Sequence, residues 1–158
     1  MFQFLKKKSY SLLAPIDGTV MSLDEVKDPI FSQRMMGDGI AIAATGDLVC
    51  APADGLITVT IEARHAFGMS LDNGMELLIH VGINTPMNHQ DAFEILIDEN
   101  KRVTAGTPII RIDHSRLDED ILITPIIITN PECFQIIHSH LDEQATASET
   151  TIIDYIPH

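Results

Sequence analysis

Short apolar segments rich in β-branched residues alternate with Gly, Pro and Asp-Gly along most of this chain. The pattern begins near Leu12 and continues towards the C-terminal end, with few apolar repeats at long helical spacing. Apolar segments of this length, separated by turn residues, are typical of strands. The chain is therefore predicted to be all-β.

One piece of this pattern occurs twice. The sequence Leu13-Ala-Pro-Ile-Asp-Gly-Thr-Val20 is echoed by Cys50-Ala-Pro-Ala-Asp-Gly-Leu-Ile57. Each copy places a proline before a turn and a glycine where the chain bends into the next strand. Because one short unit cannot bury its apolar face alone, the echo predicts two related units packed as an antiparallel β-sandwich or flattened barrel.

The second half of the chain continues the pattern. Further strands are predicted over 107–112, 121–129 and 151–156, and the polar segment 141–150 is predicted to be a loop. Two short peripheral helices are expected at 93–100 and, after an Asn130-Pro131 cap, at 133–138.

A β-hairpin is predicted around Asn73-Gly74, because this pair between two apolar runs favours a tight primed turn. A two-residue loop places Phe67 opposite His80 and His65 opposite Gly82. Since side chains alternate along a strand, Phe67 and the two histidines then share one face and the histidines are diagonal neighbours. A four-residue loop keeps this arrangement, whereas a three-residue loop moves one histidine to the other face.

The predicted meeting of His65 and His80 is the first chemical signal. Two neutral imidazoles at one spot can act as nucleophile and phosphate partner, as an acid and base, or as half of a metal site. Either histidine taken alone is more often a buried core residue. Gly82 leaves room for a ligand or for close approach of the backbone.

Composition restricts the partners and the location. The chain has 158 residues, enough for one domain, which is expected over 12–158 after a flexible tail at 1–11. Ten basic and 23 acidic residues give a net charge of −13, which argues against nucleic acid and favours a partner with a basic face. Isolated Cys50 and Cys133, without a secretory signal or membrane-spanning run, predict a cytoplasmic protein. The basic and apolar tail could contact a membrane transiently.

Several further motifs, in order and spacing, resemble the glucose-class IIA component of the bacterial phosphoenolpyruvate-dependent sugar phosphotransferase system. The resemblance runs from about Leu12 to the C-terminal end. The motifs are Ala14-Pro-Ile-Asp-Gly18, Phe31-Ser-Gln-Arg-Met-Met-Gly-Asp-Gly-Ile-Ala-Ile42, Ala51-Pro-Ala-Asp-Gly55, His65-Ala-Phe67, Glu76-Leu-Leu-Ile-His-Val-Gly-Ile-Asn-Thr85 and Thr124-Pro-Ile-Ile-Ile-Thr-Asn130.

The resemblance implies a phosphocarrier. His80 would accept a phosphoryl group on Nε2 from the carrier protein HPr and pass it to a cysteine of a sugar-specific IIB domain of a membrane permease. His65 would stabilise the phosphoryl group, and the backbone carbonyl of Gly82 would hold the Nδ1 proton of His80. This chemistry needs no metal and no cofactor. A further option is zinc held by His65 and His80 when a partner supplies a carboxylate.

The resemblance also implies a docking face. An apolar rim of Phe31, Met35, Met36 and Ile61 would exclude water and protect the phosphoryl group from hydrolysis. Methionines beside a turn are, without the resemblance, more often core residues. Asp38 has two interpretations, a role in the turn or a contact with a basic partner.

Three positions depart from the family pattern. Ala63 replaces a threonine whose hydroxyl helps to orient the first histidine, and Asn84 replaces an aspartate that could face a basic carrier. The segment 87–93 lacks the glycines and the lysine that are usual there. The departures leave the proposed nucleophile unchanged.

Two other functions remain open. A regulatory module of the same fold would be phosphorylated as a signal, or would dock on regulatory target proteins, without carrying sugar flux. A zinc hydrolase is suggested by the His138-Ser-His140 pair, although this pair follows a predicted helix and other ligand motifs are absent. His89, His114 and His158 have no partner motif, and no sequence feature identifies the sugar.

Overall fold

The computed structural model describes residues 8–61, 65–83 and 91–158. These residues form short antiparallel strands with a few helical turns, so the all-β prediction is confirmed. The strands are β1 (Tyr10–Leu13), β2 (Gly18–Ser22), β3 (Asp38–Ala44), β4 (Leu48–Cys50), β5 (Gly55–Ile61), β6 (Ala66–Leu71), β7 (Glu76–His80), β8 (Phe93–Ile95), β9 (Arg102–Val103), β10 (Pro108–Ile112), β11 (Leu122–Ile128), β12 (Phe134–Ser139), β13 (Gln144–Ala145) and β14 (Thr151–Pro157). The helical elements are η1 (Leu23–Glu25), α1 (Pro29–Ser32), η4 (His114–Arg116) and η5 (Pro131–Cys133).

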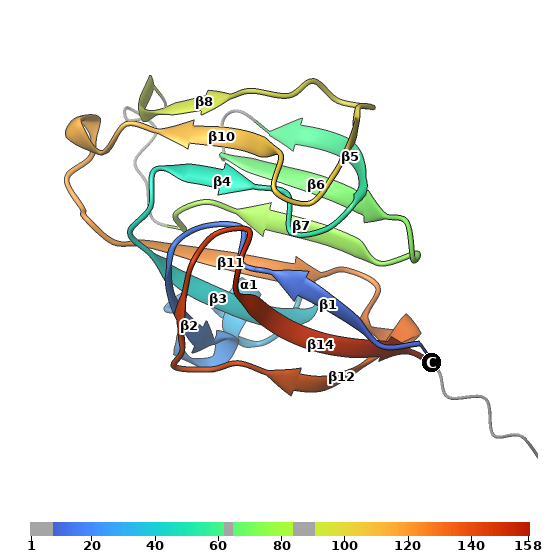
Figure 1. The fold of residues 1–158 in the computed structure, drawn as a ribbon. Coiled ribbons are helices and arrows are strands. Elements are labelled where there is room, and N and C mark those ends of the chain that lie inside the picture. The colour runs from blue at the N-terminus through green and yellow to red at the C-terminus, as the bar shows by residue number, and fades with distance from the viewer. Residues whose placement is uncertain (1–7, 62–64, 84–90) are drawn as a thin grey trace, which may run out of the picture.

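The strands form three sheets (Figure 1). The large sheet has the order β13-β2-β3-β11-β7-β6-β5-β9, and the two small sheets have the orders β1-β14-β12 and β4-β10-β8. Because the described strands leave β13 and β9 as the edges of the large sheet, the sandwich form of the prediction applies and the sheet does not close into a barrel.

The main core lies between the large sheet and the two small sheets. It contains Ile42 and Phe67 from the large sheet, Ile110 from one small sheet and Ile153 from the other. A second, smaller cluster packs on the opposite face of the large sheet, where η1 and α1 cover it. Strands β3 and β11 are therefore buried on both faces, which explains their continuous apolar character.

The sequence echo corresponds to a repeated structure. Leu13 N donates to Pro52 O at 3.0 Å, and the equivalent Cys50 N donates to Pro15 O at 2.7 Å. The two copies thus hold each other by reciprocal hydrogen bonds. Pairing of β2 with β13 in one half likewise matches pairing of β5 with β9 in the other. The prediction of two related units is confirmed by this geometry.

The predicted strands 107–112, 121–129 and 151–156 are present as β10, β11 and β14. Within the predicted loop 141–150 lies the two-residue strand β13. The expected tail boundary falls inside β1, because Tyr10 and Ser11 already pair with Tyr155 and Asp154. Residues 1–7 of the predicted tail lie outside the described residues.

Both predicted helices were wrong. The first begins as strand β8, in which Phe93 pairs with Ile112 of β10. The second is strand β12, in which Phe134 joins the core and Ile136 packs against it. In each case apolar side chains at alternate positions pack against the core beside a neighbouring strand, and this packing outweighs the helical spacing. The Asn130-Pro131 cap begins only the single turn η5.

Candidate functional site

The hairpin of β6 and β7 has a different register from the predicted one. Leu71 N donates to Met75 O, so the turn contains the three residues 72–74, and Gly74 takes the left-handed φ of +92° that such turns use. His80 consequently pairs with Ala66, and Phe67 pairs with Ile79. The prediction that Phe67 and His80 share a face was wrong, because Phe67 points into the main core.

A local backbone feature brings His65 near His80 despite this register. His65 has a φ of +51°, so the alternation of β6 does not extend to it. Its carbonyl accepts a hydrogen bond from Val81 N at 3.0 Å. The backbone at His65 therefore lies beside the segment that contains His80 and Val81. The charge of His80 also lowers the pKa of His65. The two histidines are therefore neighbours because of the left-handed backbone at His65, which the alternation of side chains along a strand does not predict.

His65 is 3% exposed. Burial first, and the charge of His80 second, lower its pKa from 6.5 to about 4, so the imidazole is neutral near pH 7. Its Nε2 atom is buried and has no hydrogen-bond partner among the described residues. One face of the ring stacks on Phe93, with ring centroids 3.7 Å apart. Sequence reasoning missed this contact, because it assigned Phe93 to a helix.

His80 ends β7 on the face that carries the small cluster. Its ring lies 5.7 Å from that of Phe31, centroid to centroid. A cavity of about 330 Å³ opens beside it and is mostly apolar in its lining. The lining residues are Asp28, Ile30, Phe31, Met36, Ile61, Ala66, Leu78, His80 and Ile83.

Three of the predicted docking residues, Phe31, Met36 and Ile61, therefore lie around His80. Met35 does not line the cavity; it is next to Met36 in the sequence and is 70% exposed. Sequence reasoning missed Ile30, whose neighbours Asp28 and Pro29 form an N-cap and a first helical position. That capping pattern was the available signal for α1.

Asp38 has a partner within the chain. Arg34 Nε donates to its Oδ1 at 3.0 Å, and Arg34 Nη1 donates to Asp24 Oδ1 at 2.7 Å. Asp38 Oδ1 also accepts from Gly39 N at 2.8 Å. Asp38 thus has a structural role in the turn, and its contact with a basic partner stays a prediction.

Gly82 comes shortly after β7 and has a φ of +76°, a conformation that glycine adopts without the steric cost of a side chain. The three departures lie largely beyond the described residues: positions 63 and 84, and residues 87–90 of the segment 87–93. His89 also lies outside them. His114 Nε2 is 2.7 Å from Gly46 O, a contact within the fold.

The His138 and His140 pair lies at the end of β12, where the rings are 4.4 Å apart. Both ring nitrogens of His140 are engaged, Nδ1 with Glu143 and Nε2 with Asp154, each at 2.8 Å. No group of three or more His, Cys, Asp or Glu within the described ranges has a metal-binding arrangement. His140 therefore has no ring nitrogen left for zinc, and zinc shared with a partner at His65 and His80 stays a prediction.

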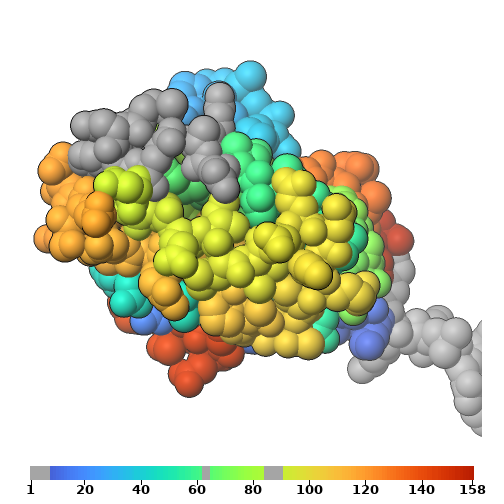
Figure 2. Space-filling view, turned by 90° about the horizontal axis from the view of Figure 1, so that it is seen from above, coloured from blue at the N-terminus to red at the C-terminus, as the bar shows by residue number. Residues whose placement is uncertain are grey.

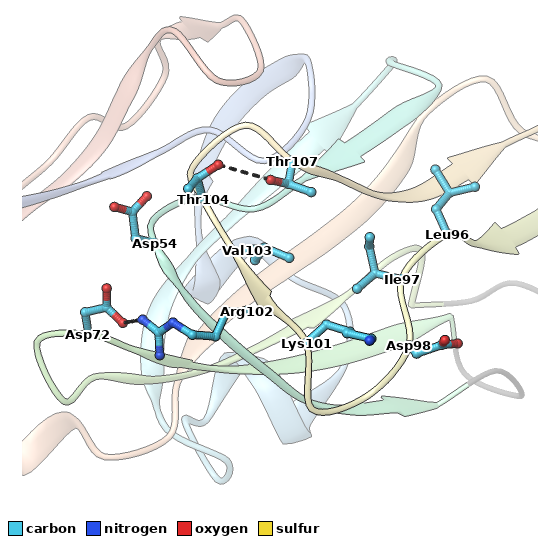
Figure 3. Close-up of a pocket in the computed structure, with 10 residues that line it drawn as sticks. All are labelled: Asp54, Asp72, Leu96, Ile97, Asp98, Lys101, Arg102, Val103, Thr104 and Thr107. Atoms are coloured by element: carbon cyan, nitrogen blue, oxygen red, sulfur yellow. Dashed lines mark hydrogen bonds and ion pairs between the residues drawn. The ribbon is translucent and has the colours of Figure 1, made fainter.

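A larger cavity of about 590 Å³ lies apart from the histidines, between the start of β5, the β6–β7 turn and the segment from β8 to β10 (Figure 3). Two of its charged groups, Arg102 and Asp72, pair with each other, and Asp54 accepts a hydrogen bond from Ala105 N. The cavity next to His80 is smaller, and it combines a mostly apolar lining with a histidine.

The chain matches the family model of the phosphoenolpyruvate-dependent sugar phosphotransferase system, EIIA 1, over residues 10–134. It is 37% identical over 150 residues to a PTS system glucose-specific EIIA component of Bacillus cereus, covering 94% of this chain and 91% of the relative. A component of the same name from Staphylococcus epidermidis is 33% identical over 93% of this chain and 90% of its own.

A solved structure gives the same result. Glucose permease IIA from Mycoplasma capricolum superposes with a TM-score of 0.82, at 27% identity, covering 96% of this chain and 99% of the other. No helix in the described part of the chain has the length and apolar character to cross a membrane. Sequence, fold and motif order agree, and the chain belongs to the EIIA 1 family of the phosphoenolpyruvate-dependent sugar phosphotransferase system.

Proposed function

We propose that the chain is a phosphohistidine carrier in which His80 takes a phosphoryl group from phospho-HPr and passes it to a cysteine of a IIB domain. The observation that carries this proposal is the position of His80, beside a buried neutral histidine and an apolar cavity. A neutral imidazole is a competent nucleophile near pH 7, and the phosphoramidate it forms remains reactive enough to be passed on.

In the proposed step, the lone pair of His80 Nε2 attacks the phosphorus of the donor. A new P–N bond forms as the donor P–N bond breaks, and that electron pair stays on the donor imidazole. The Gly82 carbonyl is proposed to hold the Nδ1 proton of His80, so that Nε2 presents its lone pair. His65 is proposed to face the phosphoryl oxygens through Nε2, a buried polar atom with no partner among the described residues.

The proposed docking face surrounds His80. Met35, Ile30 and Met36 are 70%, 43% and 40% exposed, an unusual exposure for large apolar side chains that lie together. Flexible methionines can adapt to more than one partner surface, as a carrier that meets HPr and IIB in turn requires. Phe31 and Ile61 complete the apolar part, and Asp38 is proposed to meet a basic residue of the partner.

The relatives suggest the receiving partner. Those from B. cereus and S. epidermidis are named glucose-specific EIIA components. A Staphylococcus carnosus relative, 42% identical over 119 residues, is named a glucose-specific EIICBA component, of which the match covers 18%. We therefore propose a cytoplasmic role beside a glucose-type permease, with glucose as the first sugar to test.

The test is intact mass spectrometry under non-acidic conditions after incubation with phosphoenolpyruvate, enzyme I and HPr. Non-acidic conditions are needed because acid hydrolyses phosphohistidine. The wild type should gain one phosphoryl group, His80→Ala should gain none, and His65→Ala should still gain one. An unmodified wild type would contradict the carrier chemistry.

The regulatory alternative is separated by complementation of cells that lack their own IIA component. Restored sugar uptake supports the flux carrier. Failure to restore uptake despite normal phosphorylation would favour the regulatory module.

A further inference from the structure

Phe93 makes an unusually close contact with His65. The ring centroids are 3.7 Å apart and the ring planes differ by 15°, so the rings are nearly parallel. Phe93 begins β8 in the small sheet β4-β10-β8, whereas His65 precedes β6 in the large sheet. A side chain from one sheet thus covers a face of an imidazole that belongs to the other. Figure 2 looks onto the side of the molecule where the segment containing β8, in yellow-green and yellow, lies at the surface.

The backbone of His65 does not fix the plane of its ring. Its left-handed φ of +51° takes it out of the strand, and its carbonyl bond to Val81 N leaves rotation about the side-chain torsions free. A parallel aromatic contact restricts this rotation, because tilting the imidazole would lose contact area and bring the rings into collision. Contact with Phe93 therefore restricts the plane of the His65 ring.

The orientation of the His65 ring matters because its Nε2 atom is buried. The Nε2 atom of His65 is buried without a partner among the described residues, and a buried polar atom normally has one. The rigid stack keeps this atom aimed before any phosphoryl group arrives. A donor that is already aimed stabilises a transferring group more effectively than one that must reorient.

We propose that Phe93 is a positioning residue that holds the imidazole of His65 in the orientation needed to meet a phosphoryl group on His80. This inference rests on the proposed carrier function. Phe93 itself touches no reacting atom and acts through His65. The contact also links the small sheet to the phosphoryl site, so that the geometry of β8 affects transfer.

Replacement of the ring tests this role. Phe93→Leu keeps an apolar side chain but removes the stack, whereas Phe93→Tyr keeps the ring. Transfer from phospho-HPr to each variant is followed by rapid quenching at several HPr concentrations. In Phe93→Leu we expect the maximal rate to fall about tenfold or more with little change in KM, since small misplacements of a catalytic group can cost up to about a hundredfold. Phe93→Tyr should restore the wild-type rate.

Phe134→Leu is the matched control. Phe134 is a buried aromatic residue whose ring packs against Tyr155 at 5.5 Å, and that contact joins β12 and β14 rather than β8 and the hairpin. This variant should lose stability while transferring at the wild-type rate. If Phe134→Leu slowed transfer as much as Phe93→Leu, a general loss of packing would explain both and the positioning role would be wrong.

A double-variant cycle and a spectroscopic signal complete the test. In a His65→Gln background, Phe93→Leu should cause no further loss of rate, because the residue through which it acts is gone. In NMR spectra the His65 ring protons should lose their upfield ring-current shift in Phe93→Leu and keep it in Phe93→Tyr.

The outcomes separate this inference from the carrier proposal. Failure of the wild type to accept a phosphoryl group would contradict the carrier function and this role with it. A phosphorylated wild type together with wild-type transfer by Phe93→Leu, or an equal loss in both backgrounds, would overturn the positioning role alone.

Discussion

The position and the burial of the His65 ring depend on one backbone torsion and one side-chain contact. Its left-handed backbone brings the ring beside His80, and stacking with Phe93 covers one face of it. Burial then removes the ring from water and lowers its pKa to about 4. At neutral pH the imidazole of His65 is therefore uncharged.

The same burial predicts acid sensitivity. Below pH 6.5 the unfolded chain binds a proton at His65 that the folded state does not bind until about pH 4. The stability that the neutral His65 contributes is thus fully present above pH 6.5 and is lost as the pH falls to about 4. The total loss is on the order of 3 kcal/mol, at about 1.4 kcal/mol per pKa unit. Urea unfolding between pH 7.5 and pH 4 should show a steeper loss for the wild type than for His65→Gln. Parallel curves for the two proteins would contradict this assignment.

At the scale of the elements, the length of the β6–β7 turn decides how these two strands pair. The three-residue turn 72–74 sets the register in which His80 pairs with Ala66. Asn73 helps to hold this turn, since its Oδ1 accepts from Met75 N at 3.2 Å and its Nδ2 donates to Tyr155 Oη at 2.5 Å. The contact with Tyr155 comes from β14, so a distant strand takes part in the choice of turn.

Another element-level feature is a set of side-chain contacts centred on Asp154 across the sheet β1-β14-β12. His140 follows β12 and contacts Asp154 of β14, and the other oxygen of Asp154 accepts from Ser11 of β1 at 2.7 Å. The hydrogen bond to Asp154 is the main reason that the pKa of His140 is raised above 6.5, and Glu143 adds to it. The protonated ring thus links all three strands of this sheet.

Stability from this contact should decrease with rising pH. A histidine whose folded pKa is raised contributes fully below pH 6.5 and loses its contribution as the pH rises through the folded value. The free energy of unfolding of the wild type should exceed that of His140→Gln by up to about 1 kcal/mol at pH 6, with a smaller difference at pH 9. Asp154→Asn should remove most of this pH dependence. A difference that grew towards pH 9 would show that His140 is not the responsible group.

At the scale of the whole molecule, the fold is built from two related halves. Asp17 Oδ1 accepts from Ala147 N at 2.7 Å, and the equivalent Asp54 Oδ1 accepts from Ala105 N at 2.8 Å. His80 ends β7, which pairs with β6 on one side and with β11, through Ile126–Ile128, on the other.

The equivalence of the halves predicts equal effects of equivalent substitutions. Asp17→Asn and Asp54→Asn each weaken one side-chain contact with a backbone N–H, and each should cost about 1 kcal/mol of unfolding free energy. Urea unfolding at pH 7 measures both. A cost confined to one variant would mean that the halves, although alike in geometry, differ in their energetic dependence on this contact. Phosphorylation of His80 should be unaffected in either variant.

Much of this architecture was predictable from local pattern. The β-branched runs and turn residues predicted the strands β10, β11 and β14, and the echo predicted the two halves. The apolar residues near His80 were predicted as a set from the family resemblance, and Phe31, Met36 and Ile61 do line its cavity. Strands β8 and β12 were not predicted, since their short apolar spacing fits a helix and a strand equally and a neighbouring strand decided between them.

The sequence by itself determined the fold class and the family, because these depend on residue types at fixed spacing along the chain, and it singled out His65 and His80 as candidate site residues. The tertiary structure decided the hairpin register, the pairing of Arg34 with Asp38 and the stack of Phe93 on His65. A turn of two or three residues satisfies Asn73-Gly74 nearly equally well. The difference comes from contacts between residues far apart in sequence, such as Asn73 with Tyr155, which form only when the sheets pack together.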